Sequence, residues 1–280
     1  MWPLKSRPVV PVLRLCGPIG LATPLQSSLS SMILSGPIEK AFTMSRCSAV
    51  AIIVNSPGGS PVQSDLILKR VRQLAAQEKK RVYVFCEDVA ASGGYYIAIS
   101  GDEVYANVSS IIGSIGVISA GFGFDKLLQK IGIERRVYTA GLNKSTLDPF
   151  KPENPKDVEH IKTIQKNIHD SFIGVVKDRR AGKLKGTDIE LFSGSFWTAP
   201  QALEFGLIDG ISDVRTKMRE VYGDKVSLKL VPIYSGNLLS RLYRRHDLFG
   251  KPSVWQNGTS LSDEILSTIE ARLMWSRYGL

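Results

Sequence analysis

Two glycine-rich turns carry the residues of this sequence that are best suited to chemistry. Asn55-Ser-Pro-Gly-Gly-Ser60 and Ala90-Ala-Ser-Gly-Gly-Tyr95 each follow an apolar run. Glycine lets the backbone adopt a positive φ or approach a ligand closely, and amides beside a helix N-terminus can bind developing negative charge. Ser92 stands among small neighbours, as in a nucleophile elbow, although the GxSxG pattern is absent. Each turn by itself also fits a purely structural role.

A serine nucleophile requires a base that can accept its proton. The chain has three histidines, His160, His169 and His246. The first two stand nine residues apart on one expected helix, so they form no metal pair and are interpreted as ordinary helix side chains. A lysine can serve instead when it is partly desolvated, because its free pKa is roughly 10.4. Lys144 lies in a polar loop, where lysine is usually solvated, so spacing alone does not select it.

Signatures of cofactor and metal binding are missing from the sequence. No GxGxxG follows a strand, no GxxxxGK[ST] loop occurs, and no CxxC or Cys/His spacing suggests zinc. Cys16, Cys47 and Cys86 are too few and too scattered for a disulfide framework, which favours a reducing compartment. We therefore expect no cofactor and no metal.

Composition limits the class of protein further. The 280 residues are 43% hydrophobic and 22% charged, which excludes a disordered, collagen-like or bare coiled-coil chain. The net charge of +10 is spread without a basic run, which favours a solvated surface over nucleic-acid binding. No stretch approaches the roughly 20 apolar residues of a membrane span, and Pro11 breaks the apolar run that a signal peptide would need. We expect a cytoplasmic chain that binds no nucleic acid.

Alternating strands and helices must position the two turns. Apolar runs predict strands over 8–15, 49–54, 81–86, 103–106, 134–138 and 226–231. Helical spacing predicts helices over 61–80, 92–100, 125–132, 157–180, 199–205 and 213–222. Residues 17–36, with room for a short helix, and 141–156 are expected to be loops. The strand–turn–helix–strand units indicate right-handed βαβ crossovers and an α/β fold.

Several motifs share their order and spacing with one known family. They are Asn55-Ser-Pro-Gly-Gly-Ser60, Ala90-Ala-Ser-Gly-Gly-Tyr-Tyr96, Gly113-Ser-Ile-Gly-Val117, Gly141-Leu-Asn-Lys144 and Phe196-Trp-Thr-Ala-Pro-Gln-Ala-Leu-Glu-Phe-Gly-Leu-Ile-Asp209. Across about residues 45–215 the chain resembles the protease IV / signal peptide peptidase A family of serine peptidases. The resemblance implies a ClpP/crotonase-like fold of repeated ββα units, in the short single-domain form without the N-terminal membrane anchor of many members.

The resemblance also implies a role for each site residue. Ser92 corresponds to the nucleophile, and Lys144, 52 residues later, to the general base. Ser114 would hydrogen-bond the lysine, and the backbone N–H groups of Gly58 and Gly93 would form the oxyanion hole. The implied activity is that of an ATP-independent serine endopeptidase, which uses a Ser-Lys dyad to hydrolyse extended peptides, remnant signal peptides among them.

Partners and domain bounds complete the expectation. Family members form homo-oligomeric rings or domes, often complete the dyad across subunits, and take unfolded or extended peptides. We predict an N-terminal strand and loop segment over 1–45, the peptidase domain over 46–232, and a basic amphipathic tail over 233–280. The tail is expected to dock on a partner subunit or on the fold itself, and its basic cluster predicts a peripheral contact with an anionic membrane surface.

Other functions of the same fold stay open at this point. A crotonase-type acyl-CoA enzyme would need the oxyanion glycines but no serine–lysine pair. A ClpP-type protease would need a histidine soon after the serine turn, and none lies between Ser92 and Lys144. A non-catalytic scaffold would need neither side chain, so the Ser-Lys endopeptidase is the favoured hypothesis.

Overall fold

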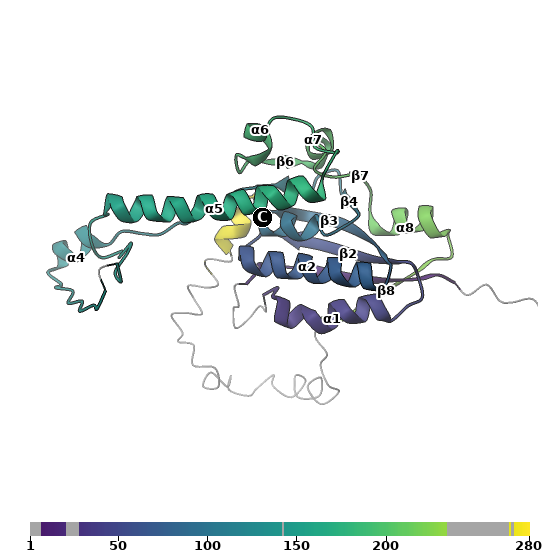
Figure 1. Cartoon of the computed structure of the whole chain (residues 1–280), viewed down its shortest axis with the longest axis horizontal. Coiled ribbons are helices and arrows are strands. Elements are labelled where there is room, and N and C mark those ends of the chain that lie inside the picture. Colours follow the sequence, from purple (N-terminus) through teal and green to yellow (C-terminus); the bar gives the residue numbers. More distant parts are fainter. Residues whose placement is uncertain (1–6, 21–27, 142, 234–268, 270–271) are drawn as a thin grey trace, which may run out of the picture.

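The computed structural model describes residues 7–20, 28–141, 143–233, 269 and 272–280. Most of the predicted tail over 233–280 therefore lies outside the described residues. The described chain forms one sheet with helices on both faces and a long helix that extends beyond the sheet (Figure 1). The predicted α/β class is confirmed.

Eight strands form the sheet, and most of them run parallel. They are β1 (Val9–Cys16), β2 (Ala49–Ser56), β3 (Arg81–Ala91), β4 (Glu103–Ala106), β5 (Ile111–Gly113), β6 (Phe196–Thr198), β7 (Gly210–Ile211) and β8 (Ser227–Leu230). The main order is β6-β5-β3-β2-β1-β8, with β4 beside β3 and β7 beside β4. Only β6 runs antiparallel, against β5. The carboxyl ends of β2 and β3 therefore meet at one edge, where both glycine-rich turns begin.

Helices cover both faces of this sheet, as a parallel sheet requires. They are α1 (Ser31–Thr43), α2 (Pro61–Gln77), α3 (Gly93–Ala98), α4 (Asp125–Ile131), α5 (Pro155–Arg179), α6 (Asp188–Phe192), α7 (Ala199–Glu204) and α8 (Val214–Tyr222). One core cluster joins the sheet to α1, α2, α3 and the end of α5, and a second joins its other face to Met218 of α8. The residues of the two glycine-rich turns are therefore attached to a sheet whose two faces are both buried.

The helix after the first turn begins where its sequence provides a cap. The Ser60 hydroxyl accepts a hydrogen bond from the Gln63 amide, and Pro61 occupies the first turn, where no N–H donor is needed. The apolar face of α2 is buried through Ile67, Val71 and other residues. The predicted helix over 61–80 is confirmed, with its end at Gln77.

Strand β3 extends five residues beyond the predicted end at Cys86. The acidic side chains of Glu87 and Asp88 in this extension both have partners: Arg14 donates to Glu87, and the Asn55 amide donates to Asp88. After this pair β3 leaves β4 and runs beside β5, so that it ends at Ala91, directly before Ser92.

Two further expectations were wrong, and four short elements were missed. Residues 134–138 form no strand: they are exposed, and the structure pairs their charged side chains through Arg135–Asp148 and Arg136–Glu134. The loop expected over 17–36 ends at Ser30, which caps the 13-residue helix α1. The elements β5, α6, β6 and β7 were not predicted, because segments of two to five residues are too short to show a period.

A projecting arm, defined here as residues 117–163, leaves the body of the molecule. It contains α4, the turns that follow it and the first part of α5 (Figure 1). None of the described residues from 116 to 171 is buried. None of the helices that the described residues form has both the length and the apolar character that crossing a membrane requires. A segment this exposed has no core of its own, so its apolar side chains lack a covering surface in the single chain.

The last residues of the chain pack on the body beside β3. Tyr278 is buried in a small cluster with Val89 and Ala91, and its ring lies edge-on to Phe196 at 5.2 Å between centroids. Trp275 packs against the same cluster. Of the two docking modes expected for the tail, the described end shows contact with the fold itself.

Candidate active site

Ser92 is held in a backbone conformation that L-residues rarely adopt. It connects β3 to α3 with φ 52° and ψ −123°. Such a conformation costs of order 1–3 kcal/mol and persists only where the surroundings impose it. Here the Ser92 amide donates to the Gly113 carbonyl at 2.8 Å, and the Ser92 carbonyl accepts from the Tyr96 amide at 3.0 Å. The side chain stays half-buried, so the hydroxyl is presented at the edge of the sheet.

The turn after β2 lies directly against Ser92. Gly58 has φ +105°, and a Cβ atom there would lie 2.8 Å from the Ser92 Cβ and 2.9 Å from the Gly93 nitrogen. Only glycine allows this approach. The Gly58 amide donates to the Ser56 hydroxyl at 3.2 Å, a long bond, and Gly93 opens α3, where helix geometry gives an amide no partner within the helix. The backbones of Gly58 and Gly93, predicted to supply the oxyanion amides, therefore lie close to Ser92.

Ser114 lies beside Ser92, directly after the neighbouring strand β5. It is a second non-glycine residue with positive φ, 51°, and it is buried. Its amide donates to the Ser195 carbonyl at 2.7 Å, while Gly113, directly before it, accepts from Ser92. A Cβ atom at Gly113 would lie 2.6 Å from the Trp197 ring, so this strand end is closely packed. The sheet thus places Ser114 next to Ser92.

Lys144 is not brought to Ser92 within one chain. It lies in the arm between α4 and α5, and its side chain is exposed. Its amide donates to the Gly141 carbonyl, but its ammonium makes no hydrogen bond or ion pair with the residues that the structure describes. The structure therefore assembles Ser92, Gly58, Gly93 and Ser114 and leaves the lysine apart.

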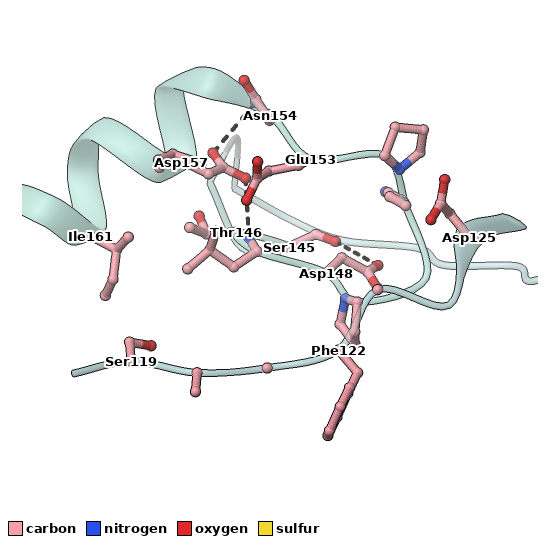
Figure 2. A pocket seen from close by; sticks show the side chains of 18 of the residues that line it. Ser119, Phe122, Asp125, Ser145, Thr146, Asp148, Glu153, Asn154, Asp157 and Ile161 are labelled. Atoms are coloured by element: carbon pink, nitrogen blue, oxygen red, sulfur yellow. Dashed lines mark hydrogen bonds between the residues drawn. The ribbon is translucent and has the colours of Figure 1, made fainter.

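The turn that carries Lys144 is nevertheless well fixed. It borders a hollow in the arm, shown in Figure 2, where Ser145 donates to Asp148 and the Leu147 amide donates to Asp157 at 3.1 Å. The Phe150 amide, with Arg135 and Ser145, holds the pKa of Asp148 below its usual range. An ionised Asp148 keeps these donors, so the turn presents its lysine outward in a defined conformation.

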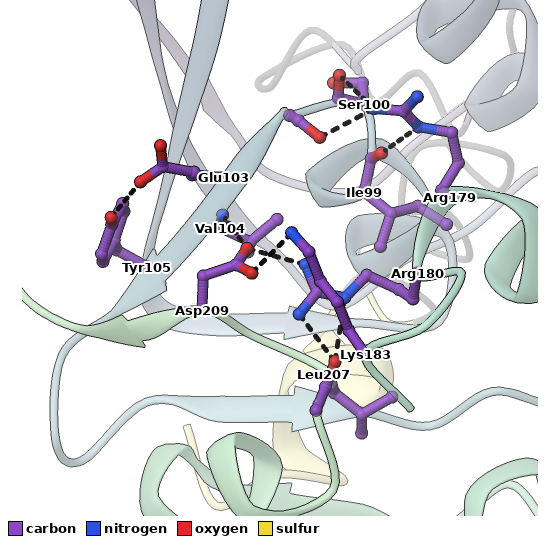
Figure 3. Close-up of polar contacts among 12 residues, drawn as sticks. Ile99, Ser100, Glu103, Val104, Tyr105, Arg179, Arg180, Lys183, Leu207 and Asp209 are labelled. Atoms are coloured by element: carbon purple, nitrogen blue, oxygen red, sulfur yellow. Dashed lines mark hydrogen bonds and ion pairs between the residues drawn. The ribbon is translucent and has the colours of Figure 1, made fainter. Parts of the chain in front are cut away.

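Basic residues support the far end of α3, which Figure 3 shows. Arg179 donates to the carbonyls of Ile99 at 2.9 Å and Gly101 at 2.8 Å, and Arg72 donates to the carbonyl of Ser100 at 3.1 Å. Cations at a helix C-terminus interact favourably with its unpaired carbonyls. Burial lowers the pKa of Arg179. These contacts tie α5 to α3, the helix that follows Ser92.

Asp209 organises the region behind α3 and was not singled out from the sequence. It accepts from Arg180 and Lys183, both at 2.7 Å, and from the Val104 amide (Figure 3). Burial alone would raise its pKa, but these hydrogen bonds keep the pKa of Asp209 below its usual range. The only sequence signal was its place at the end of the 196–209 motif. Among the described residues, no group of three or more His, Cys, Asp or Glu could hold a metal ion.

Known proteins similar to the chain differ in how much of it they match. An Na(+)/H(+) antiporter NhaA of Brucella abortus is 53% identical over 272 residues, which are 97% of this chain and 37% of that protein. The chain therefore spans little more than a third of the length of this relative. A putative protease of Synechocystis is 31% identical over 189 residues, 65% of this chain and 67% of the relative. A putative signal peptide peptidase SppA of Enterococcus faecium is 32% identical over 162 residues, 58% of this chain and 46% of the relative.

Structure comparison and family comparison agree with the motifs. A mutant of the 1510-N membrane-bound stomatin-specific protease superposes with a TM-score of 0.50 at 16% identity, over 81% of this chain and 99% of that one. At this identity the likeness concerns the fold. The family model described as Peptidase family S49 matches residues 74–226. Since this match spans more than half of the sequence and includes both Ser92 and Lys144, the chain belongs to peptidase family S49.

Proposed function

We propose that the chain is a serine endopeptidase in which Ser92 is the nucleophile and Lys144 of a neighbouring copy is the general base. The observation that carries the proposal is the conformation of Ser92: a non-glycine residue held at φ 52° between two close glycine amides. Strained residues of this kind concentrate at functional sites. Membership of a peptidase family supplies the class of substrate, a peptide.

The reaction follows from these groups. The Ser92 hydroxyl attacks the peptide carbonyl while the lysine amine accepts its proton. The amides of Gly58 and Gly93 stabilise the developing oxyanion, with about 2.7–4 kcal/mol typical for one such donor. The C–N bond then breaks, the protonated lysine returns its proton to the leaving amine, and Ser92 remains as an ester. Water, deprotonated by the same lysine, hydrolyses the ester and restores the hydroxyl.

The position of Lys144 is the reason for invoking a second copy. The arm holds the lysine away from the body of its own chain, and the arm exposes many apolar side chains. They include Ile118, Phe122, Leu127, Ile131, Ile133 and Tyr138. Apolar surface of this extent is typical of protein interfaces. In a ring or dome each arm would lie on the next body, where desolvation favours the neutral amine and Ser114 can hydrogen-bond it.

The arrangement also favours extended substrates. After β5 the chain from 116 to 123 runs without helix or strand, so its backbone groups can pair with an extended peptide by adding a strand. Enclosure in a ring would admit unfolded segments and exclude folded proteins. Remnant signal peptides fit this class, and a relative of the chain from Enterococcus faecium is named a putative signal peptide peptidase.

The experiment is cleavage of casein and of a fluorogenic peptide by the wild type, Ser92→Ala and Lys144→Ala. Both variants should lose nearly all activity and keep their oligomeric size, because each removes a side chain that the core does not need. Lys151→Ala, an exposed lysine in the same loop region, is the matched control and should cleave normally. Wild-type cleavage by Ser92→Ala would overturn the proposal.

Co-expression of Ser92→Ala with Lys144→Ala tests the sharing of the dyad. If the base comes from a neighbour, mixed assemblies contain some intact sites, about one quarter in a randomly mixed ring. We expect activity to return in the mixture to roughly that fraction. A mixture as inactive as its components, with mixed assembly verified by mass, would show that the lysine serves its own chain.

A further inference from the structure

His169 on α5 contacts the strand end that carries Ser114. Its Nε2 lies 3.0 Å from the carbonyl oxygen of Ile115, 54 positions earlier in the chain. A carbonyl oxygen can only accept, so Nε2 carries the proton and donates. The sequence suggested an ordinary helix side chain at this position. The structure instead gives the half-buried imidazole a specific partner directly after Ser114.

The hydrogen bond from His169 to Ile115 matters because the strained backbone of Ser114 must be held by contacts from the chain around it. Ser114 has φ 51°, which costs free energy for any residue but glycine. On one side its amide donates to the Ser195 carbonyl, and a Cβ at Gly116 would lie 3.0 Å from the Gly194 Cα. On the other side the bond from His169 fixes the peptide group after Ile115. The strand end is therefore held between the loop that precedes β6 and the helix α5.

The imidazole is unsuited to be the base itself. Its Nε2 is engaged by a backbone carbonyl, so this nitrogen cannot accept the proton of Ser92 while the contact lasts. Other residues of α5 contact α3. Phe172 packs on Tyr96 at 4.8 Å between ring centroids, and Arg179 donates to carbonyls at the end of α3. The same helix thus supports both the nucleophile helix and the Ser114 strand end.

We infer that His169 is a positioning residue for the peptidase reaction: by holding the Ile115 carbonyl it keeps Ser114 oriented toward the incoming lysine. The inference rests on the proposed function. It assigns to His169 an effect on the chemical step, exerted through Ser114, with no contact to the substrate. The expected signature is a lower kcat with an unchanged KM, because orientation of the base acts in the transition state.

The first test compares substitutions at position 169. His169→Leu removes the donor and should lower kcat about tenfold, the loss typical of one hydrogen bond. His169→Gln keeps an N–H donor near the place of Nε2 and should restore kcat to within about threefold of wild type. Asn167→Leu, at an exposed position of the same helix outside the arm, should cleave normally. A Gln variant as impaired as the Leu variant, or a Leu variant with wild-type kcat, overturns the inference.

The second test is a double-mutant cycle with Ser114→Ala. If His169 acts through Ser114, adding His169→Leu to Ser114→Ala should lower kcat no further. Additive losses would overturn the inference, since they place the effect elsewhere. Should His169→Leu fail to fold, His169→Asn, which is polar but too short to reach Ile115, replaces it in both tests.

Ser92→Ala in the same set separates the two proposals. If it keeps wild-type cleavage, the proposed function fails and the inference falls with it. If it is inactive while His169→Leu is fully active, only the inference fails. Melting temperature and oligomer mass of every variant verify that the compared proteins are folded and assembled.

Discussion

At the scale of single residues, the site depends on groups that approach more closely than side chains normally permit. Gly58 lies against Ser92 and Gly93, and Ser92 itself is held at a positive φ by a bond to Gly113. The cost of this strain is offset by the buried strands that fix both turns. Substitutions here should therefore change the chemistry by displacing an amide or a hydroxyl by less than an ångström.

The first prediction at this scale concerns Gly58→Ala. The added Cβ would lie 2.8 Å from the Ser92 Cβ, and φ is +105°, so the turn must move away from the nucleophile. Because this displaces an oxyanion amide, kcat should fall about 100-fold or more. Gly174→Ala is the matched control: its Cβ meets nothing within 4 Å in α5, and helix propensity makes it neutral or slightly stabilising. Peptide cleavage and thermal melting of both variants check the prediction, which equal activities would contradict.

At the scale of elements, α3 depends on the helices around it. Six residues are too few for a helix to be stable alone, and its last carbonyls receive their donors from Arg179 of α5 and Arg72 of α2. The orientation of α3 therefore depends on contacts from both α2 and α5. The support comes from residues far apart in sequence.

A prediction for Arg179→Met follows. The substitution leaves the carbonyls of Ile99 and Gly101 without a donor in a partly buried place, which should lower the free energy of unfolding by about 1–3 kcal/mol. Arg179→Lys keeps the charge without the planar fork, so it should recover only part of the loss. Urea denaturation measures both, with Arg219→Met, at an exposed position of α8, as the control. A loss at Arg179 no larger than at Arg219 would show that these contacts contribute little.

Elements with a clear pattern of apolar residues were predicted from the sequence. Elements whose extent depends on contacts between distant residues were not. Strand β2 and helices α2 and α5 were predicted because their apolar residues recur regularly. The extension of β3 through Glu87 and Asp88 depends on Arg14 and Asn55, which only the folded sheet brings near. The strand expected over 134–138 contains Val137 and Tyr138, which favour strands, but the arm offers it no neighbouring strand among the described residues.

The candidate site, too, was predictable from the sequence only where local patterns reveal it. The glycine-rich turns identified Ser92 as a candidate, because turn chemistry is local and visible in the sequence. The pairing of Ser92 with Lys144 came from a resemblance, and no pattern in the sequence could show that the arm carries Lys144 away from the body. The roles of Ser92, Lys144, Ser114 and the two glycines stay predictions until variants are measured.

At the scale of the whole molecule, the proposed catalytic residues are divided between the body and the arm. The body holds Ser92 and the backbones of Gly58 and Gly93, while the arm holds Lys144 and an uncovered apolar surface. In the proposed reaction the site is complete only when the arm of one copy reaches the body of another. Activity should therefore depend on protein concentration, since dilution below the dissociation constant of the assembly separates serine from base.

The last prediction tests this dependence through Tyr138→Asp. The Tyr138 side chain is 91% exposed in the arm, so an aspartate there disturbs no contact within the chain, and the melting temperature of the body should be unchanged. In an assembled ring the charge would be buried against an apolar surface, which should dissociate the copies and abolish cleavage. Ile189→Asp, 83% exposed on α6 of the body, is the control and should stay assembled and active. Light scattering gives the mass and peptide hydrolysis the activity; a monomeric variant that cleaves normally would show that one chain contains a complete site.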